Sequence, residues 1–527
     1  MKRMLWLWLI LAVVLGNACC VDSQQKPAQS ESIPRTSEPA APTAAPAAAA
    51  ASTDKPTSEP IVLAGQAYRG DETALSLVLT AEEMPLLDRF SRLETLDLSG
   101  SACYAQILAY AQTHPQVRVV YTVDVEGQAV PSDAEELTLS ALTDPGLLTY
   151  LPRLKSVTMS APLPLAEAEA LHAAAPQASL GGELTFAGLT VPLDAEALDL
   201  SAIAPEDVDD CRRAVALLPQ LKQVELDPAE GESPWTLEEA GSLVVQYPDL
   251  LVQYTATVFG VTFSLTDEVV SFNRIDLKDQ EAELRRILPY MAHVGRLDME
   301  YCNIPDERMA ELRSDFPAPK IVWRVFLKGR YHCRTDAIMI RFSNDSDGER
   351  LYDKDTHPLI YCNELKYVDL GHDKITDAYF TAYMPELEVL ILAVGEITDI
   401  SALKNCPKLE YLEIFTGHLT DISVLAELKN LKHLNMANNK ISDITPLFEL
   451  NLERLFLSRN PIPKEQIEAF RKRFPNCDVD SVLSNPTGGT WRKPGGRYTL
   501  LRKQLSYDNV SINTYSAFNQ PWTPETP

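Results

Sequence analysis

The later part of the chain carries a regular pattern of apolar and polar positions. Apolar residues occupy the first, fourth and sixth places of five segments that begin at residues 365, 387, 409, 431 and 452. The segments follow one another at spacings of 22, 22, 22 and 21 residues. This pattern predicts one short strand per repeat with its three apolar side chains pointing inward. Because one repeat cannot bury its own apolar side chains, we expect the strands to stack into a parallel sheet.

The ninth place of each repeat is the position of a predicted turn. It holds Asp373, Gly395, Gly417, Asn439 and Asn460. An asparagine side chain can hydrogen-bond the backbone of such a turn. We therefore expect hydrogen-bonded turns at the two asparagines and looser turns at the other three positions.

A second, longer pattern occupies the earlier part of the chain. Four stretches predicted to be helical each end at a proline, and a glycine follows twelve residues later. The pairs are Pro115 and Gly127, Pro176 and Gly188, Pro248 and Gly260, and Pro317 and Gly329. Every second residue between proline and glycine is mostly apolar, which predicts a strand entering a hairpin turn. A fifth predicted helix, over 465–474, ends at Pro475 without a clear hairpin.

The return strand of each hairpin is expected to contain the residue twelve places beyond the glycine. These residues are Leu139, Leu200 and Phe272 in three of the copies. We interpret residues 63–350 as four divergent repeat modules with a hairpin insert in each. A separate α+β domain is the alternative.

The late pattern resembles a known repeat family. Residues 365–480 follow the motif LxxLxLxxNxL and are similar to the 22-residue leucine-rich repeats of bacterial, internalin-type surface proteins. The resemblance implies an α/β solenoid with one parallel strand per repeat, here over residues 351–482. It also implies a role in binding protein ligands, usually through the concave face of the sheet, without identifying the ligand.

The first twenty residues have the features of an export signal. Met1-Lys2-Arg3 is basic, and the apolar run from Met4 to Leu15 is too short to span a bilayer as a helix. Residues 1–20 are therefore predicted to be a signal peptide of the lipoprotein type, with the lipid on Cys19 (or Cys20). Ordinary cleavage after Ala18 and secretion is the alternative.

Two other segments differ in composition from the repeats. Residues 21–62 are rich in Pro and Ala and almost lack large apolar side chains, so we expect a disordered tether. Residues 483–527 are basic and aromatic, with Trp491 followed by Arg492 and Lys493. This tail is expected to cap the last repeat; a contact with the cell wall, a glycan or a partner, and disorder, are the alternatives. Together the segments predict an exported protein anchored by lipid at the extracellular face of the cell membrane.

Composition narrows the possible functions. The 527 residues include 74 acidic and 47 basic side chains, a net charge of −27, which argues against nucleic acid as a partner. The chain has only 8 histidines and none of the phosphate-loop, zinc-helix or nucleophile-elbow motifs. We therefore expect a non-enzymatic protein without catalytic residues, cofactor or metal. An enzyme hidden in the N-terminal region is the weaker alternative.

The binding surface can be predicted from the repeat pattern. The third, fifth and seventh places should face outward on the concave side of the sheet. The candidate protein-binding residues there are Tyr367, Val389, Ile391, Tyr411, Glu413, Phe415, His433, Arg454 and Phe456. An exposed face this rich in apolar and aromatic side chains is typical of an interaction site. Two alternatives remain: the basic aromatic tail covers this face, or the protein associates with copies of itself.

Two of the cysteines also follow the repeat. Cys362 and Cys406 are two repeats apart, and the same place holds Met384 between them and Leu428 after them. A place shared by apolar and weakly polar residues predicts buried thiols rather than a disulfide.

Overall fold

A computed structural model describes residues 60–329, 331–342, 349–482 and 491. The repeats form the unit that begins at Ile61. The predicted signal peptide with Cys19 and Cys20, almost the whole tether, and the tail other than Trp491 lie outside the described residues.

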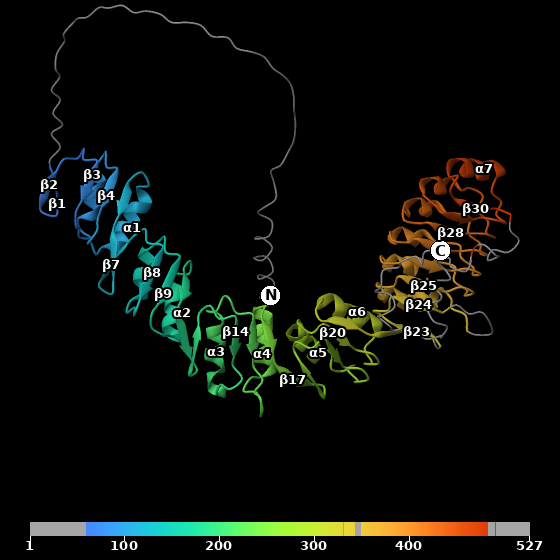
Figure 1. Cartoon of the computed structure of the whole chain (residues 1–527), viewed down its shortest axis with the longest axis horizontal. Coiled ribbons are helices and arrows are strands. Elements are labelled where there is room, and N and C mark those ends of the chain that lie inside the picture. The colour runs from blue at the N-terminus through green and yellow to red at the C-terminus, as the bar shows by residue number, and fades with distance from the viewer. Residues whose placement is uncertain (1–59, 330, 343–348, 483–490, 492–527) are drawn as a thin grey trace, which may run out of the picture. The chain divides into compact units, whose positions relative to one another are not determined.

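Four modules occupy the N-terminal part of this unit, and each contains a three-stranded parallel sheet (Figure 1). The first is made of β3 (Ala74–Ser76), β4 (Thr95–Asp97) and β5 (Arg118–Val120), and the second of β8 (Glu136–Leu139), β9 (Ser156–Met159) and β11 (Ser179–Gly181). The third is made of β14 (Ala197–Asp199), β15 (Gln223–Glu225) and β16 (Leu251–Gln253), and the fourth of β19 (Val269–Ser271), β20 (Arg296–Asp298) and β21 (Lys320–Val322).

The helices that were expected to end before prolines are present. They are α1 (Tyr104–Thr113), α2 (Leu165–Ala174), α4 (Leu237–Gln246), α6 (Asp306–Asp315) and α7 (Lys464–Arg473). Proline removes a backbone donor and disfavours helical backbone in the residue before it, which stops each helix at this point. Two further helices, α3 (Val208–Val215) and α5 (Glu281–Ile287), were not predicted.

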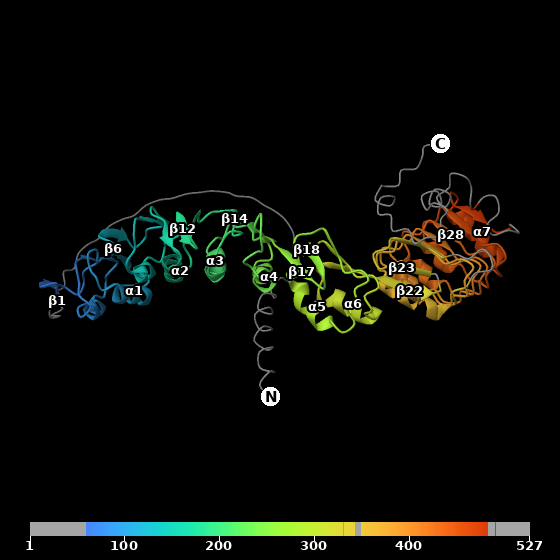
Figure 2. The same ribbon diagram turned by 90° about the horizontal axis from the view of Figure 1, so that it is seen from below.

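All four predicted hairpins are confirmed. They pair β6 (Thr122–Val125) with β7 (Gln128–Pro131), β12 (Glu183–Phe186) with β13 (Leu189–Pro192), β17 (Thr255–Val258) with β18 (Val261–Ser264), and β22 (Arg324–Lys328) with β23 (Tyr331–Arg334). In the first, Glu126 and Gly127 both have positive φ, 52° and 78°, as a two-residue turn of primed type requires. A fifth hairpin, β1 (Ile61–Leu63) with β2 (Gln66–Tyr68), was not predicted. Figure 2 shows helices α1 to α6 along one side of the modules and the hairpin strands β6, β12 and β18 along the other.

Two details of the hairpin prediction were wrong. The single strand expected after each proline is two short strands, as β5 joins the parallel sheet and β6 turns into the hairpin. Leu139, Leu200 and Phe272 do not lie in return strands: Leu139 ends β8, and the other two follow β14 and β19 directly. The return strands are only about four residues long, so twelve residues beyond the glycine the chain has already entered the next module.

A seven-stranded, fully parallel sheet forms the C-terminal part. It consists of β24 (Met339–Arg341), β25 (Tyr367–Asp369), β26 (Val389–Ile391), β27 (Tyr411–Glu413), β28 (His433–Asn435), β29 (Arg454–Phe456) and β30 (Asp478–Asp480), in that order. The five predicted repeat strands are β25 to β29, and their inward-facing residues are buried in the main core, as expected. Strand β24 belongs to the fourth hairpin module in sequence but pairs with β25, so the sheet crosses the predicted boundary at residue 350.

Short elements complete the repeats. They are the two-residue strand β10 (Leu163–Pro164) and the 3₁₀ helices η1 (Met84–Arg89), η2 (Pro145–Tyr150), η3 (Pro205–Asp207), η4 (Leu288–Met291), η5 (Asp353–Tyr361), η6 (Tyr379–Tyr383), η7 (Ser401–Asn405), η8 (Ser423–Glu427) and η9 (Thr445–Glu449).

The side-chain hydrogen bonds in the turns after the repeat strands depend on which residue stands at the ninth place of the repeat. The Nδ2 of Asn439 donates to the carbonyls of Ile414 (2.8 Å) and Met436 (3.1 Å), and its Oδ1 accepts from the amide of Leu419 (3.1 Å). Asn460 makes the equivalent contacts, so the hydrogen-bonded turns at both asparagines are confirmed. At Asp373 only Oδ1 is paired, accepting from the amide of Leu351 at 2.8 Å, and Oδ2 is buried without a partner in the described part of the chain. Burial raises the pKa of this carboxyl to about 7.

The seven described cysteines are free thiols. Cys362, Met384, Cys406 and Leu428 are all buried, which confirms that their shared place packs in the core. The sulfur atoms of Cys333 and Cys362 lie 3.6 Å apart.

Candidate functional site

The concave face of the seven-stranded sheet is organised in rows across the strands. Because the strands pair in register, Tyr367, Val389, Tyr411, His433 and Arg454 are successive neighbours in one row. Two residues further along each strand, Asp369, Ile391, Glu413, Asn435 and Phe456 form a second row. Adjacent strands are about 4.8 Å apart, so each row is a continuous surface of side chains.

The apolar members of these rows form a hydrophobic cluster separate from the main core. It comprises Met339, Tyr367, Val389, Ile391, Ala393, Tyr411, Phe415, Ala437, Phe456 and Trp491. The sequence pattern therefore assigned these side chains to the correct side of the sheet. The expectation that they are exposed was wrong, since Tyr411 is 3%, Phe415 5% and Phe456 1% exposed. Of the remaining candidates, Glu413 is fully buried, and His433 and Arg454 are partly buried.

Trp491 accounts for part of this burial. Its indole Nε1 donates to Oε1 of Glu413 at 2.7 Å, although the two residues are 78 positions apart in the chain. Its ring lies 5.5 Å from that of Tyr411 and 4.9 Å from that of Phe456, measured between centroids. Arg454 donates to the backbone carbonyl of Trp491 at 3.2 Å. A residue of the basic aromatic tail thus covers the concave face, as one of the two alternatives predicted.

Glu413 is the polar centre of this site. It is a fully buried carboxyl group within a row that also holds Ile391 and Phe456. The Tyr411 hydroxyl donates to its Oε1, the same oxygen that accepts from the indole of Trp491. Burying a carboxylate is costly unless hydrogen bonds replace its water, and donors to a charged oxygen form strong hydrogen bonds. The site is therefore suited to an aromatic side chain that carries an N–H or O–H donor.

Charged side chains border the cluster. Arg454 pairs with Asp478 at 3.2 Å, and its guanidinium carbon lies 5.9 Å from the centroid of the Trp491 ring. Arg341 pairs with Asp369 at 3.5 Å on the β24 side. An apolar centre with a charged rim is the usual anatomy of a protein-binding surface.

A buried ion-pair cluster lies in the fourth module and was not predicted from sequence. Arg334 on β23 pairs with Asp298 (2.8 Å), Glu300 (2.8 Å) and Asp336 (2.9 Å), and all four side chains are buried. It connects the hairpin to the end of β20. The sequence shows only scattered charges here, because Glu300 and Asp298 lie 34 and 36 residues before Arg334.

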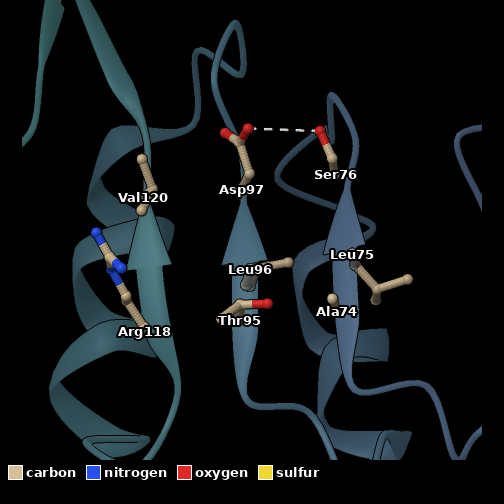
Figure 3. Close-up of a pocket in the computed structure, with 8 residues that line it drawn as sticks. All are labelled: Ala74, Leu75, Ser76, Thr95, Leu96, Asp97, Arg118 and Val120. Carbon is tan, nitrogen blue, oxygen red and sulfur yellow. Dashed lines mark hydrogen bonds between the residues drawn. The ribbon is translucent and has the colours of Figure 1, made fainter.

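The concave face of the first module is different in character. A hollow of about 400 Å³ is lined by Ala74, Leu75, Ser76, Thr95, Leu96, Asp97, Arg118 and Val120 (Figure 3). The Ser76 hydroxyl donates to Asp97 at 3.5 Å, and hydrogen bonds from Ser99 lower the pKa of the Asp97 carboxyl. This face is open and mixes polar with aliphatic side chains, whereas the face over β27–β29 is aromatic and covered.

Within the described ranges, no three His, Cys, Asp or Glu side chains are grouped so that they could hold a metal ion. The helices in the same ranges are all too short or too polar to cross a membrane.

The chain is similar to one repeat family and to several solved structures. Residues 415–449 match a family model described as leucine-rich repeats in two copies. No curated protein matches the chain. Among solved structures, an internalin from Listeria monocytogenes is 16% identical, with 79% of this chain and 84% of that chain covered and a TM-score of 0.23.

Two further solved structures are similar over comparable lengths of this chain. A leucine-rich repeat protein from Leptospira interrogans is 16% identical, covering 76% of this chain and 92% of that one, with a TM-score of 0.24. The ectodomain of the Arabidopsis thaliana receptor kinase GASSHO1/SCHENGEN3, in complex with CASPARIAN STRIP INTEGRITY FACTOR 2, is 15% identical, covering 78% and 41%, with a TM-score of 0.24. The in-register parallel strands and the family match together identify the fold as an α/β leucine-rich repeat solenoid.

Proposed function

We propose that this protein is an extracytoplasmic leucine-rich repeat protein that binds another protein non-covalently through the concave face of β24–β30. Cys19 (or Cys20) would carry a lipid that holds the protein at the extracellular face of the cell membrane. The tether would be shorter than the predicted residues 21–62, because β1 begins at Ile61. The net charge of −27 makes nucleic acid an unfavourable partner.

The observation that carries this proposal is the second hydrophobic cluster. A sheet face that served only as solvated surface would need no aromatic residues, yet this one holds Tyr367, Tyr411 and Phe456 in adjoining rows. Aromatic side chains bordered by an arginine are the most frequent hot spots of protein interfaces. The partner would bind over this cluster, with His433 and Arg454 at its partly exposed margin.

The repeat fold supports binding rather than catalysis. Leucine-rich repeats expose an extended surface built from many small units, which suits recognition of a large ligand. The receptor-kinase ectodomain named above was solved with a ligand bound. We propose no cofactor and no reaction for this chain.

The binding proposal is tested by a pull-down with the full chain against extracts of the producing cells and of candidate partner cells. The test variant is His433→Ala with Arg454→Ala, because these partly exposed side chains can be shortened with little loss of core. The control is Tyr383→Ala, an aromatic residue on η6 that is 52% exposed. A partner should be retained by the wild type and the control, and at least about tenfold less by the test variant.

Two outcomes contradict the proposal. Equal retention by all three proteins would move binding away from this face, for example to the hollow of the first module. If the pull-down retains no partner and the protein associates with itself in a concentration-dependent way in sedimentation, a structural, self-assembling protein would be favoured.

The lipid anchor is tested separately by metabolic labelling with a radioactive fatty acid. The wild type should be labelled, and Cys19→Ala with Cys20→Ala should not. An unlabelled wild type found in the medium would establish secretion instead.

A further inference from the structure

The concave face of the sheet contacts Trp491 through hydrogen bonds as well as through its apolar ring. The indole N–H meets Glu413, the ring packs against Tyr411 and Phe456, and the backbone carbonyl accepts from Arg454. A carboxylate acceptor, two aromatic rings and a guanidinium donor thus converge on one residue. Only tryptophan among the apolar side chains combines a large ring with an N–H donor.

The position of Trp491 does not suit a simple end cap. A cap of a repeat array covers the edge of the last repeat, which in this sheet is β30. The contacts just described lie instead on β27 and β29, on the face of the sheet and on either side of β28. Trp491 therefore occupies the surface on which an external ligand would bind, rather than the edge that a cap must protect.

The buried carboxyl group of Glu413 explains why a hydrogen-bond donor should be bound over β27–β29. The carboxyl group is fully buried while Trp491 is in place, and the indole N–H is one of its hydrogen-bond donors. If the indole leaves, Glu413 keeps the hydrogen bond from the Tyr411 hydroxyl but loses that of the indole, and a carboxylate in an apolar cluster is costly with fewer donors. A replacement indole restores both the hydrogen bond and the ring contacts.

We propose that the concave face over β27–β29 is an indole-binding site, and that Trp491 is its resident intramolecular occupant. A protein ligand that presents an exposed tryptophan binds there by displacing Trp491. This inference rests on the proposed function, because it names the chemistry that the partner must offer. It makes Trp491 an autoinhibitory contact, since the site is open to the partner only in the fraction of molecules from which Trp491 has left.

The size of the effect follows from that fraction. The apparent dissociation constant of a ligand is its intrinsic value divided by the fraction of molecules with an open site. If Trp491 leaves the site in fewer than about one molecule in ten, removing it strengthens binding at least about tenfold.

The test uses the full chain and N-acetyl-L-tryptophanamide, a small probe that has both the indole N–H and the backbone carbonyl. Its affinity is measured by ligand-detected NMR for the wild type and for Trp491→Ala, with folding checked by circular dichroism. Trp491→Ala should bind the probe at least about tenfold more tightly than the wild type. The 1-methyl-indole analogue should bind this variant at least about tenfold more weakly than the probe, because it cannot donate to Glu413.

Equal affinity of the folded variant and the wild type would overturn the proposal, as would equal affinity for the probe and its methylated analogue. If Trp491→Ala does not fold, Trp491→Phe keeps a ring in the site without the N–H donor. That variant must also bind the probe more tightly than the wild type, and an unchanged affinity would overturn the proposal. Probe binding without any captured partner would retain the indole site and reject only the proposed function.

Discussion

Asp373 occupies a place where the neighbouring repeats show that an asparagine fits better. At the equivalent position, Asn439 uses Oδ1 to accept from one backbone amide and Nδ2 to donate to backbone carbonyls. Asp373 keeps the acceptor contact, but its second oxygen has no donor among the described residues. By repeat equivalence this oxygen faces the carbonyl of Leu370, so an ionised carboxylate meets a like partial charge. The substitution Asp373→Asn should supply the missing donor.

The pKa of Asp373 provides the magnitude. Burial raises this pKa from 3.8 to about 7, and each tenfold gain in proton affinity corresponds to about 1.4 kcal/mol. The folded state therefore holds the proton more tightly than the unfolded state. Stability from this group is greatest below about pH 4, falls as the pH rises from 4 to 7, and stays at its lower value above 7. Asp373→Asn should be more stable than the wild type by about 2–4 kcal/mol at pH 8, and about equal to it at pH 4.

The assay is urea denaturation followed by far-UV circular dichroism at pH 4 and pH 8. The control is Asp399→Asn, which removes the same charge at an exposed turn where Oδ1 accepts from the amide of Ser401 at 2.7 Å. The control should shift the midpoint little at either pH. A test variant that is less stable at pH 8, or whose advantage is the same at both pH values, would refute the reasoning.

Two other features give independent predictions. Arg334→Met should lower the free energy of unfolding by about 3 kcal/mol in urea denaturation, because it removes a buried cation that three buried carboxylates share, although Asp298 keeps its pair with Arg296 and Glu300 its pair with Arg324. An unchanged midpoint would show that these two arginines, water or rearrangement replace Arg334. Burial raises the pKa of Cys211 to about 12 and of Cys406 to about 11, so iodoacetamide at pH 8 should label neither thiol until denaturant is added. Labelling of both thiols by mass spectrometry at the rate of a free peptide would contradict their placement in the core.

The local pattern of the sequence was enough to locate most repeat elements. Apolar residues recurring at spacings of 22 and 21 identified five strands, and the buried positions of Leu365, Leu387 and Leu409 follow from that period. The proline-to-glycine spacing identified the four hairpins. These features depend on neighbouring residues and on the fixed backbone preferences of proline and glycine, so they can be read without knowing the rest of the fold.

The division of the strand after each proline required the structure. Alternating apolar residues continue from Val119 to Val125 without a break, and both short strands satisfy that alternation. Residues 118–120 form β5 because they pair with the preceding repeat strand, β4, and the alternation itself does not specify this pairing.

Only the tertiary structure decided the state of the concave face. The repeat period by itself determined that Tyr411, Phe415 and Phe456 lie on the side of the sheet opposite the main core, and the structure agrees. Their burial could not be read from the period, because it depends on what else in the chain reaches that face. The contact of Trp491 with Glu413 closes a loop of 78 residues, and no local rule of spacing or propensity specifies such a pairing. Repetition fixes the side on which a residue lies, whereas contacts distant in sequence determine whether that side is open.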